Sequence, residues 1–168
     1  MKKIREATID DLPQIVSIYN ESIPGRLSTA DMEPQTVADK TAWFLSFATD
    51  DRPFWVCGDE AGNIMGWLCF KSFYGRCAYR GTVEVSIYVS YKYHRAGTAN
   101  MILQYAIARC PEWGIDNITA FVFSQNLGSI KLFQKFGFKK WGHLPNIAML
   151  GDERCSLEIF GLGLQKQS

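Results

Sequence analysis

The sequence predicts an α/β fold, a mixed β-sheet that carries helices on both faces. Apolar residues recur along the chain at a spacing of two, typical of strands, or of three to four, typical of helices, in the order βα(α)βββαβαββ. Of the 168 residues, 47% are hydrophobic and 14% are aromatic, which suffices for one packed core. No repeat, low-complexity run or linker interrupts the chain, so we expect one domain over residues 1–168.

The first third of the chain begins with a short predicted strand at residues 4–7. Thr8 follows as the cap of a helix over residues 10–20. The apolar side chains of this helix recur at helical spacing at Leu12, Ile15, Val16 and Tyr19. Residues 21–34 are rich in turn formers and are interpreted as a functional loop. A second helix is predicted at residues 36–49, where two aspartates and a proline end it.

Three strands are predicted in the middle of the chain. Residues 54–60 and 63–73 are strand-like and are separated by a tight Ala-Gly-Asn connection, which indicates an antiparallel hairpin. The third strand, residues 82–89, alternates strictly between two faces. One face holds Val83, Val85, Ile87 and Val89, and the other holds Thr82, Glu84, Ser86 and Tyr88.

The remaining elements alternate between helix and strand. Helical spacing returns over residues 97–110, and a buried strand is predicted at residues 117–123. Asn126 opens a further helix, which Gly137 ends as its C-cap. Two short strands complete the order at residues 138–142 and 154–161.

The charge balance excludes several classes of function. The chain has 18 basic and 17 acidic residues, a formal net charge of +1, whereas a general nucleic-acid binder usually carries a strong basic excess. We therefore expect no nucleic-acid partner, and we expect any bound anion to be held by local geometry. The GxxxxGK[ST] and GxGxxG motifs are missing from the sequence, which excludes Walker and Rossmann nucleotide sites.

The cysteine and apolar patterns indicate a soluble, cytoplasmic protein without a metal. The five cysteines are odd in number and form no CxxC pair, so they are interpreted as reduced packing residues. His143 and the five tryptophans suggest no metal site or cofactor cage. Acidic residues interrupt the N-terminus before any apolar run, and no apolar stretch approaches the roughly 20 residues of a membrane span. We therefore expect neither a signal peptide nor membrane association.

The most informative segment is a strand, a short loop and a helix over residues 82–107. Small residues such as Gly97 and Ala99 open the N-terminus of the helix, where backbone amides can bind a phosphate or pyrophosphate. The alternative is a turn between strand and helix that binds no ligand and contains a glycine, and it explains the same loop equally well. On this segment alone both interpretations stay open.

Two motifs in this region resemble signatures of the GNAT superfamily of N-acetyltransferases. HRAGTA, residues 94–99, resembles the acetyl-CoA pyrophosphate loop, usually written [QR]xxGx[GA]. NLGSIKLFQKFGF, residues 126–138, resembles the second signature, an Asn that opens a helix ending in Gly-Phe. LSTADMEPQT, RCAYRGTVEVSIYV and the stretch from LPNIAML to LEIF are similar to the phosphinothricin and methionine sulfone acetyltransferase branch. The resemblance covers nearly the whole chain, and it implies the GNAT fold with a central, largely antiparallel mixed sheet.

The resemblance also implies acetyl-CoA as co-substrate and a role for individual residues. Glu84 matches the Glu of the TVE motif and is the predicted base, which takes the ammonium proton directly or through a water. A solvated position on the strand is the alternative for Glu84. The residues implied in cofactor binding are Ile87, Tyr88, Val89, His94, Arg95, Ala96, Gly97, Thr98, Ala99, Asn100, Asn126, Ser129 and Lys135. Of these, Asn126 and Ser129 also suit helix capping, and Lys135 also suits a solvated helix surface.

For the acceptor, the resemblance points to a loop and to a pair of arginines. Guanidinium groups suit a carboxylate, or the anionic head of a phosphinate or sulfone, through bidentate hydrogen bonds. Exposed turn arginines are the alternative. The residues implied in acceptor binding are Thr29, Met32, Arg76, Tyr79, Arg80 and Glu84.

Three positions depart from the pattern of the family. His94 occupies the position usually held by Gln or Arg, so a side-chain contact with the phosphates is in question there. Phe133 occupies the position of the Tyr or His that serves many relatives as general acid, and a phenyl ring has no proton to donate. Leu157 and Glu158 replace the Trp and Asp usual in this branch.

The preferred hypothesis is an acetyl-CoA-dependent N-acetyltransferase, a homodimer that acts on the amino group of a small amino acid or analogue. Phosphinothricin, methionine sulfone and methionine sulfoximine are the analogues implied, with direct transfer in a ternary complex. A non-catalytic acyl-CoA-binding module is one alternative, suggested by His94 and Phe133. Acetylation of protein or polyamine amines is another, and it predicts an acidic acceptor pocket in place of Arg76 and Arg80.

Overall fold

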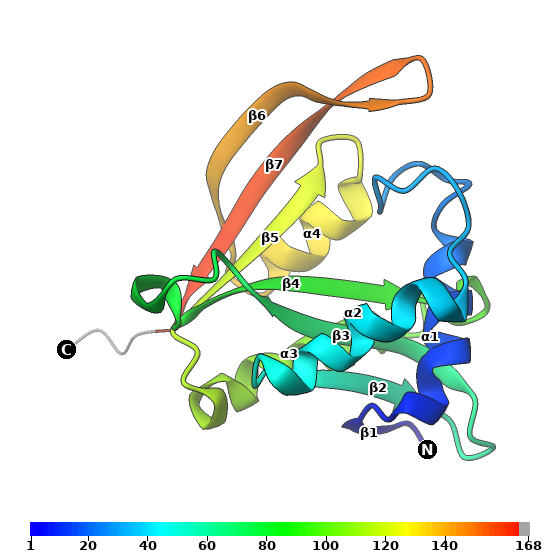
Figure 1. The fold of residues 1–168 in the computed structure, drawn as a ribbon. Coiled ribbons are helices and arrows are strands. Elements are labelled where there is room, and N and C mark those ends of the chain that lie inside the picture. The colour runs from blue at the N-terminus through cyan, green and yellow to red at the C-terminus, as the bar shows by residue number, and fades with distance from the viewer. Residues whose placement is uncertain (165–168) are drawn as a thin grey trace.

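A seven-stranded mixed sheet forms the centre of the molecule in a computed structural model that describes residues 1–164 (Figure 1). The strands are ordered β1-β2-β3-β4-β5-β7-β6 across the sheet. Neighbouring strands run antiparallel except for β4 and β5, which are parallel. The strands are β1 (Lys3–Glu6), β2 (Phe54–Gly58), β3 (Ile64–Ser72), β4 (Thr82–Val89), β5 (Asn117–Phe123), β6 (Lys139–Leu150) and β7 (Glu153–Gly163).

Two capping boxes start the helices of one face. Helix α1 (Leu12–Glu21) follows a 3-10 turn at Ile9–Asp11, where the amide of Thr8 donates to Asp11 at 2.8 Å. Helix α2 (Val37–Thr49) begins at Thr36, whose hydroxyl accepts from the amide of Asp39 at 3.1 Å. Both cap residues are threonines with an Asp three positions later, a local signal that sets a helix start without tertiary contacts.

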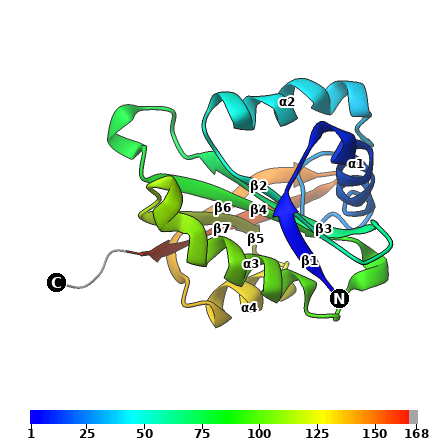
Figure 2. The same ribbon diagram turned by 90° about the horizontal axis from the view of Figure 1, so that it is seen from below.

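The helices cover opposite faces of the sheet, as Figure 2 shows. α1 and α2 pack on one face around Leu12, Phe44 and Trp67. The other two helices, α3 (Thr98–Arg109) and α4 (Leu127–Lys135), contribute Leu103 and Phe133 to the core on the other face. Because the central strands are buried on both sides, this arrangement leaves the ends of the strands as the places where a ligand can reach the sheet. Short 3-10 turns lie at Cys77–Tyr79, Tyr91–Tyr93 and Cys110–Trp113.

The element order expected from the sequence is confirmed, including the alternation along β4. Val83 and Val85 are buried among the residues of the α3 face, while Tyr88 packs against those of the α1 face. The cysteines are free, and four of the five are buried, Cys77 being the exposed one. Burial raises the pKa of the Cys110 thiol to about 12, which suits a packing residue and not a nucleophile.

The C-terminal hairpin differs from the sequence-based expectation. β6 has 12 residues and β7 has 11, so both are longer than the predicted segments. The pairing is irregular between Leu144 and Ala148, where Asn146 adopts a positive φ of 51°. Pro145 lacks an amide proton and interrupts the strand pattern locally, but pairing resumes beyond it. The hairpin therefore extends well past the rest of the sheet, as β6 and β7 show in Figure 1.

Within residues 1–164, no helix is long and apolar enough to cross a membrane. The same part of the chain contains no group of three or more His, Cys, Asp or Glu side chains that could hold a metal ion.

Candidate active site

The site begins where β4 and β5 part. β5 pairs with β4 only from Thr82 to Glu84, whereas β3 follows β4 as far as Val89. Beyond Glu84, the edge of β4 that faces β5 has no strand partner in the described part of the chain. Figure 1 shows the two strands diverging from this point. An unpaired strand edge offers main-chain donors and acceptors to an extended ligand.

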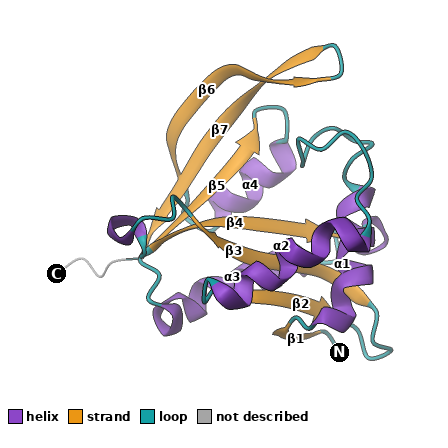
Figure 3. Ribbon diagram, in the orientation of Figure 1, coloured by secondary structure: helices purple, strands orange, loops and turns teal. Residues whose placement is uncertain are grey.

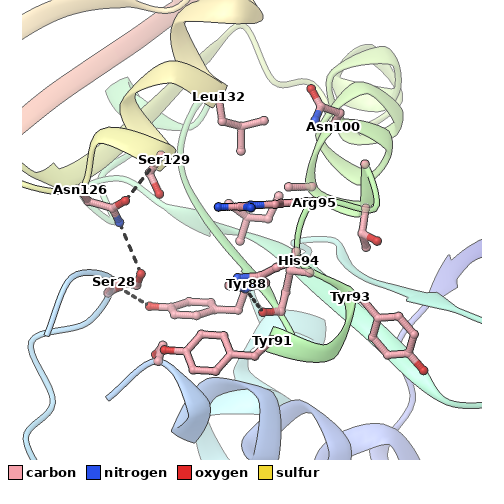
Figure 4. Close-up of a pocket in the computed structure, with 17 residues that line it drawn as sticks. Ser28, Tyr88, Tyr91, Tyr93, His94, Arg95, Asn100, Asn126, Ser129 and Leu132 are labelled. Atoms are coloured by element: carbon pink, nitrogen blue, oxygen red, sulfur yellow. Dashed lines mark hydrogen bonds between the residues drawn. The ribbon is translucent and has the colours of Figure 1, made fainter. Parts of the chain in front are cut away.

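A groove of about 440 Å³ lies at the C-terminal end of β4. It is walled by the end of β4, the turn that follows, and the first turns of α3 and α4 (Figure 4). Of the residues predicted to bind the cofactor, the lining includes Ile87, Tyr88, Val89, His94, Arg95, Gly97, Thr98, Ala99, Asn100, Asn126 and Ser129. Ala96 and Lys135 do not line it. The structure adds residues not predicted to bind here, Ser22, Ser28, Tyr91, Tyr93, Gly128 and Leu132.

The turn before α3 is shaped by two left-handed residues. Gly97 is the N-cap of α3 with φ of 75°, and Arg95 has φ of 61°, a conformation uncommon for a residue other than glycine. The chain reaches the helix without a side-chain cap. Helix geometry leaves the first amides of α3, at residues 98–100, without acceptors inside the helix. These amides can therefore bind an anion in the groove.

His94 and Lys135 contact protein atoms at the rim of this turn. The Nε2 atom of His94 lies 2.9 Å from the carbonyl oxygen of Val89, and the His94 ring meets the Tyr91 ring edge-on. The ammonium of Lys135 donates to the side-chain oxygen of Asn100 at 2.7 Å. The His94 side chain thus connects the turn to the end of β4. The Gln or Arg that is usual at this position need not make that contact.

Asn126 connects α4 to the long loop between α1 and α2. Its side-chain oxygen accepts from the amide of Ser129 at 3.1 Å, and its side-chain nitrogen donates to the carbonyl of Leu27 at 3.1 Å. The hydroxyl of Tyr88 donates to the carbonyl of Ser28 at 2.8 Å, and burial raises the pKa of this phenol. The loop, teal in Figure 3, is thereby held against the start of α4 and the end of β4. Asn126 therefore caps α4, holds the loop and lines the groove.

A second pocket, of about 390 Å³, adjoins the groove. Ser28, Ile87, Tyr88, Asn126 and Ser129 line both spaces, so the two meet at Ile87 and Tyr88 of β4. The polar side chains of its lining include Tyr19, Thr29, Asp31, Lys71 and Glu84. The apolar wall, contributed by β5, α4 and β7, includes Phe121, Phe123, Phe133 and Leu157.

Glu84 lies in this second pocket beside a lysine. Glu84 and Lys71 are cross-strand partners on β4 and β3, and the Lys71 ammonium is 3.4 Å from a Glu84 carboxylate oxygen. The side chain of Glu84 is 25% exposed and that of Lys71 is 54% exposed. Glu84 is thus accessible from the pocket and forms part of an ion pair.

The loop contributes a hydroxyl and carboxylate cluster to the same pocket. The Tyr19 hydroxyl bonds to Thr29 and donates to the carboxylate of Asp31. Burial, followed by the bond to Asp31, raises the pKa of Tyr19 to about 12. Lys40 lies 3.9 Å from Asp31 and over the Tyr19 ring. Of the two loop residues predicted to meet the acceptor, Thr29 lines the pocket, whereas Met32 is exposed and does not.

Phe133, Leu157 and Glu158, which also depart from the family pattern, differ in their surroundings. Phe133 is 3% exposed, lines the second pocket and packs against Phe138. Leu157 lines the pocket, whereas Glu158 does not and is buried instead between His143, Lys140 and Ser124. Burial favours the neutral form of Glu158, but hydrogen bonds from Lys140, Ser124 and His143 lower its pKa below the ordinary value.

The predicted arginines lie elsewhere. Arg76, Tyr79 and Arg80 line a separate hollow of about 300 Å³, beyond the start of β4. Arg52, which is 8% exposed, holds this region by donating to Ser72 at 2.9 Å and to the carbonyl of Arg80 at 2.8 Å. Within one chain the structure does not bring these three side chains to the pocket that contains Glu84.

Sequence reasoning missed Lys71, Tyr19 and Asp31 as pocket residues. Helical spacing groups Tyr19 with the apolar side chains of its helix. In the structure Tyr19 packs against the core of the α1 face and also lines the second pocket. Lys71 follows a buried run on β3, and its position opposite Glu84 depends on strand register, for which the sequence carries no local signal. Leu132 could have been predicted as a groove residue from the sequence, because it lies one helical turn after Ser129 on the same helix face.

Comparisons with known proteins give a consistent result. The profile of the Acetyltransferase (GNAT) family matches residues 12–138. YwnH of Bacillus subtilis, whose name places it with the phosphinothricin acetyltransferases, is 44% identical over 158 residues, 94% of this chain and 96% of that protein. An L-methionine sulfoximine/L-methionine sulfone acetyltransferase of Pseudomonas aeruginosa is 32% identical over 161 residues, 96% of this chain and 94% of that protein. A phosphinothricin acetyltransferase from Sinorhizobium meliloti, solved in complex with acetyl-CoA, superposes with a TM-score of 0.91 at 26% identity, covering 97% of this chain and 88% of that one.

Proposed function

Because this chain belongs to the acetyltransferase (GNAT) family, we propose that its acceptor is the amino group of a small amino acid or amino-acid analogue. The family, with solved acetyl-CoA complexes among its members, makes the chain an acetyl-CoA-dependent N-acetyltransferase. The proposal adds the class of acceptor and direct transfer between two bound substrates. The observation that carries it is the meeting of the groove and the pocket at Ile87 and Tyr88, beside Glu84.

The groove suits acetyl-CoA through the main chain more than through side chains. Acetyl-CoA supplies the activated acetyl group as a thioester. The amides at the start of α3 would hold the pyrophosphate, with the Arg95 side chain beside them in the groove. The free edge of β4 over residues 87–89 would pair with the extended arm of the co-substrate. His94 would act indirectly, through its contact with Val89.

The second pocket suits a small amine. A volume of about 390 Å³ is at the lower end of small-molecule sites, and its apolar wall can take a short side chain. Glu84 would accept the proton of the acceptor ammonium, directly or through a water, so that the nitrogen can attack. Phe133 offers no proton there, and a thiolate needs none to leave, because a free thiol has a pKa of about 8.5. The names of relatives that act on methionine sulfoximine and methionine sulfone support this acceptor class.

We include a homodimer in the proposal, as the family resemblance implies, and a cytoplasmic location. Arg76, Tyr79 and Arg80 line another hollow in their own chain, so their predicted contact with the acceptor requires a second copy. The acidic pocket expected for a protein or polyamine acceptor is only partly present, because Glu84 and Asp31 are accompanied by Lys71.

The test is a thiol-release assay with the purified chain and acetyl-CoA. Methionine sulfone, methionine sulfoximine and phosphinothricin are compared with spermidine, and the acetylated products are identified by mass spectrometry. Turnover that is at least about tenfold more efficient with the amino-acid analogues, roughly 1.4 kcal/mol, supports the proposal. A preference for spermidine contradicts it. Acetyl-CoA binding by calorimetry without turnover on any amine identifies a non-catalytic binding module instead.

A further inference from the structure

The second pocket is the proposed acceptor pocket. Lys71 is the one basic side chain among the described residues that line it. It stands directly opposite Glu84 in the strand register, and the two charged groups are 3.4 Å apart. The Lys71 side chain is 54% exposed, so its ammonium can leave the ion pair without being stranded away from water. The pocket thus presents a cation immediately beside the predicted base.

An α-amino acid carries the complementary arrangement, a nitrogen and a carboxylate on the same carbon. We propose that Lys71 binds the anionic group next to the acceptor nitrogen while Glu84 faces the nitrogen itself. The ion pair between Lys71 and Glu84 is then replaced by two contacts with the substrate, one between Lys71 and the anionic group and one between Glu84 and the nitrogen. Lys71 becomes the residue that selects amino acids and their analogues over amines without an anion. This inference rests on the proposed function and specifies which group of the chain reads the acceptor.

The second carboxylate of the pocket does not compete for this role. Asp31 is bonded to Tyr19, and its neighbouring cation is Lys40, which does not line the pocket. The carboxylate of Asp31 therefore has its own partners on α1 and α2, whereas Glu84 and Lys71 face each other across the strands. The apolar wall, which includes Phe121, Phe123, Phe133 and Leu157, suits an acceptor whose side chain is apolar. Charge and shape together favour a zwitterion with a short apolar or weakly polar side chain.

The experiment compares L-methionine with L-methioninamide, which keeps the α-amine and side chain but lacks the anion. Values of kcat/KM for both acceptors are measured at saturating acetyl-CoA for the full chain and for Lys71→Met, Lys71→Arg and Lys139→Met. The preference for methionine over its amide is expected to fall about tenfold in Lys71→Met, as for loss of a charge-assisted hydrogen bond. Lys71→Arg is expected to retain the preference within about threefold, since a guanidinium also binds carboxylates.

The ratio of the two kcat/KM values, for methionine and for its amide, distinguishes anion binding by Lys71 from an effect of Lys71 on Glu84. Loss of Lys71 also removes the partner of Glu84, and an altered base slows the more basic amine, methionine, more than its amide. The preference is therefore measured over a range of pH that extends to values at which both amines are neutral, where a change in the base affects both acceptors alike. Lys139 is exposed at the start of β6 and lines neither site, so Lys139→Met reports the effect of removing a surface charge.

Three outcomes overturn the inference. A preference that is unchanged in Lys71→Met means that the anion is bound elsewhere. If the preference for methionine falls in a parallel Arg80→Gln variant and not in Lys71→Met, the anion is bound in the separate hollow that Arg76 and Arg80 line. Failure of the unmodified chain to acetylate either acceptor, or any amine in the wider panel, removes the proposed function and this inference with it. Turnover without dependence on Lys71 overturns the inference alone.

Discussion

The groove and the proposed acceptor pocket share five lining residues, yet they offer a ligand different kinds of chemical group. The groove offers main-chain groups, the free edge of β4 and the first amides of α3, which depend on backbone conformation. The acceptor pocket offers side chains from α1, the loop, β3, β4, β5, α4 and β7. Main-chain recognition tolerates substitution wherever the backbone is kept, whereas side-chain recognition changes with each residue. We therefore expect the departure at His94 to have a small effect on co-substrate binding, whereas the departure at Phe133 changes the lining of the second pocket.

The largest effect is expected from Glu84→Gln, which removes the proposed base and keeps the shape of the side chain. We expect kcat to fall by about 10² to 10⁴, the usual contribution of general acid–base catalysis. Acetyl-CoA affinity, measured by calorimetry, should change by less than about twofold, because the groove relies on main-chain groups elsewhere. A variant that keeps more than a tenth of the activity would remove Glu84 from the mechanism.

A smaller effect, confined to the groove, is expected from Gly97→Val. Gly97 has φ of 75°, and a Cβ atom there would meet nothing within 4 Å, so any penalty arises from the backbone alone. The left-handed region costs a β-branched residue about 1 to 2 kcal/mol, so we expect the turn of the free variant to relax to another conformation. Restoring the turn on binding costs this free energy, which corresponds to an increase of roughly tenfold in the KM for acetyl-CoA.

Gly97→Asn is the matched control for that change. Asn adopts the left-handed conformation more readily, so the KM for acetyl-CoA should rise by less than about threefold. Equal effects of Val and Asn would show that the groove depends on the absence of a side chain and not on the main-chain conformation.

On the acceptor side, Tyr19→Phe is expected to lower kcat/KM for the amine by about three- to tenfold, the contribution of one hydrogen bond. The pKa of Tyr19 is raised to about 12, so the hydroxyl keeps its proton up to about pH 10 and donates to Asp31 throughout that range. The pH dependence of kcat/KM between about pH 6 and pH 10 should therefore keep its shape in the variant. A titration in that range that is lost with the hydroxyl would assign Tyr19 a proton-transfer role.

The smallest effect is expected from His94→Asn. His94 is exposed, and within residues 1–164 its ring has one hydrogen-bond contact, with the carbonyl of Val89, which water can replace. The KM for acetyl-CoA should rise by less than about threefold, as for loss of a neutral surface hydrogen bond. An increase of about a hundredfold would place His94 in direct contact with the co-substrate, and it would weaken the contrast between the two regions.

Much of the fold and of the groove was predictable, because the signals are local. Changes of apolar spacing located every helix and strand, and strict alternation placed Glu84 on the face opposite Val83 and Val85. Gly97 and Asn126 marked the two helix starts that wall the groove. The length of the C-terminal hairpin was not predictable, because pairing with β7 carries β6 past Pro145.

The sequence by itself determined the order of the elements, the family and the candidate main-chain site for the co-substrate, since each depends on residues close together in the chain. The tertiary structure alone decided which side chains line the second pocket. Strand register set Lys71 opposite Glu84, and the folding of the loop brought Asp31 and Thr29 to the pocket, while Arg76 and Arg80 line another hollow in the same chain. Register and loop packing are fixed by contacts between residues distant in sequence, and a one-residue shift would turn a different set of side chains toward the pocket.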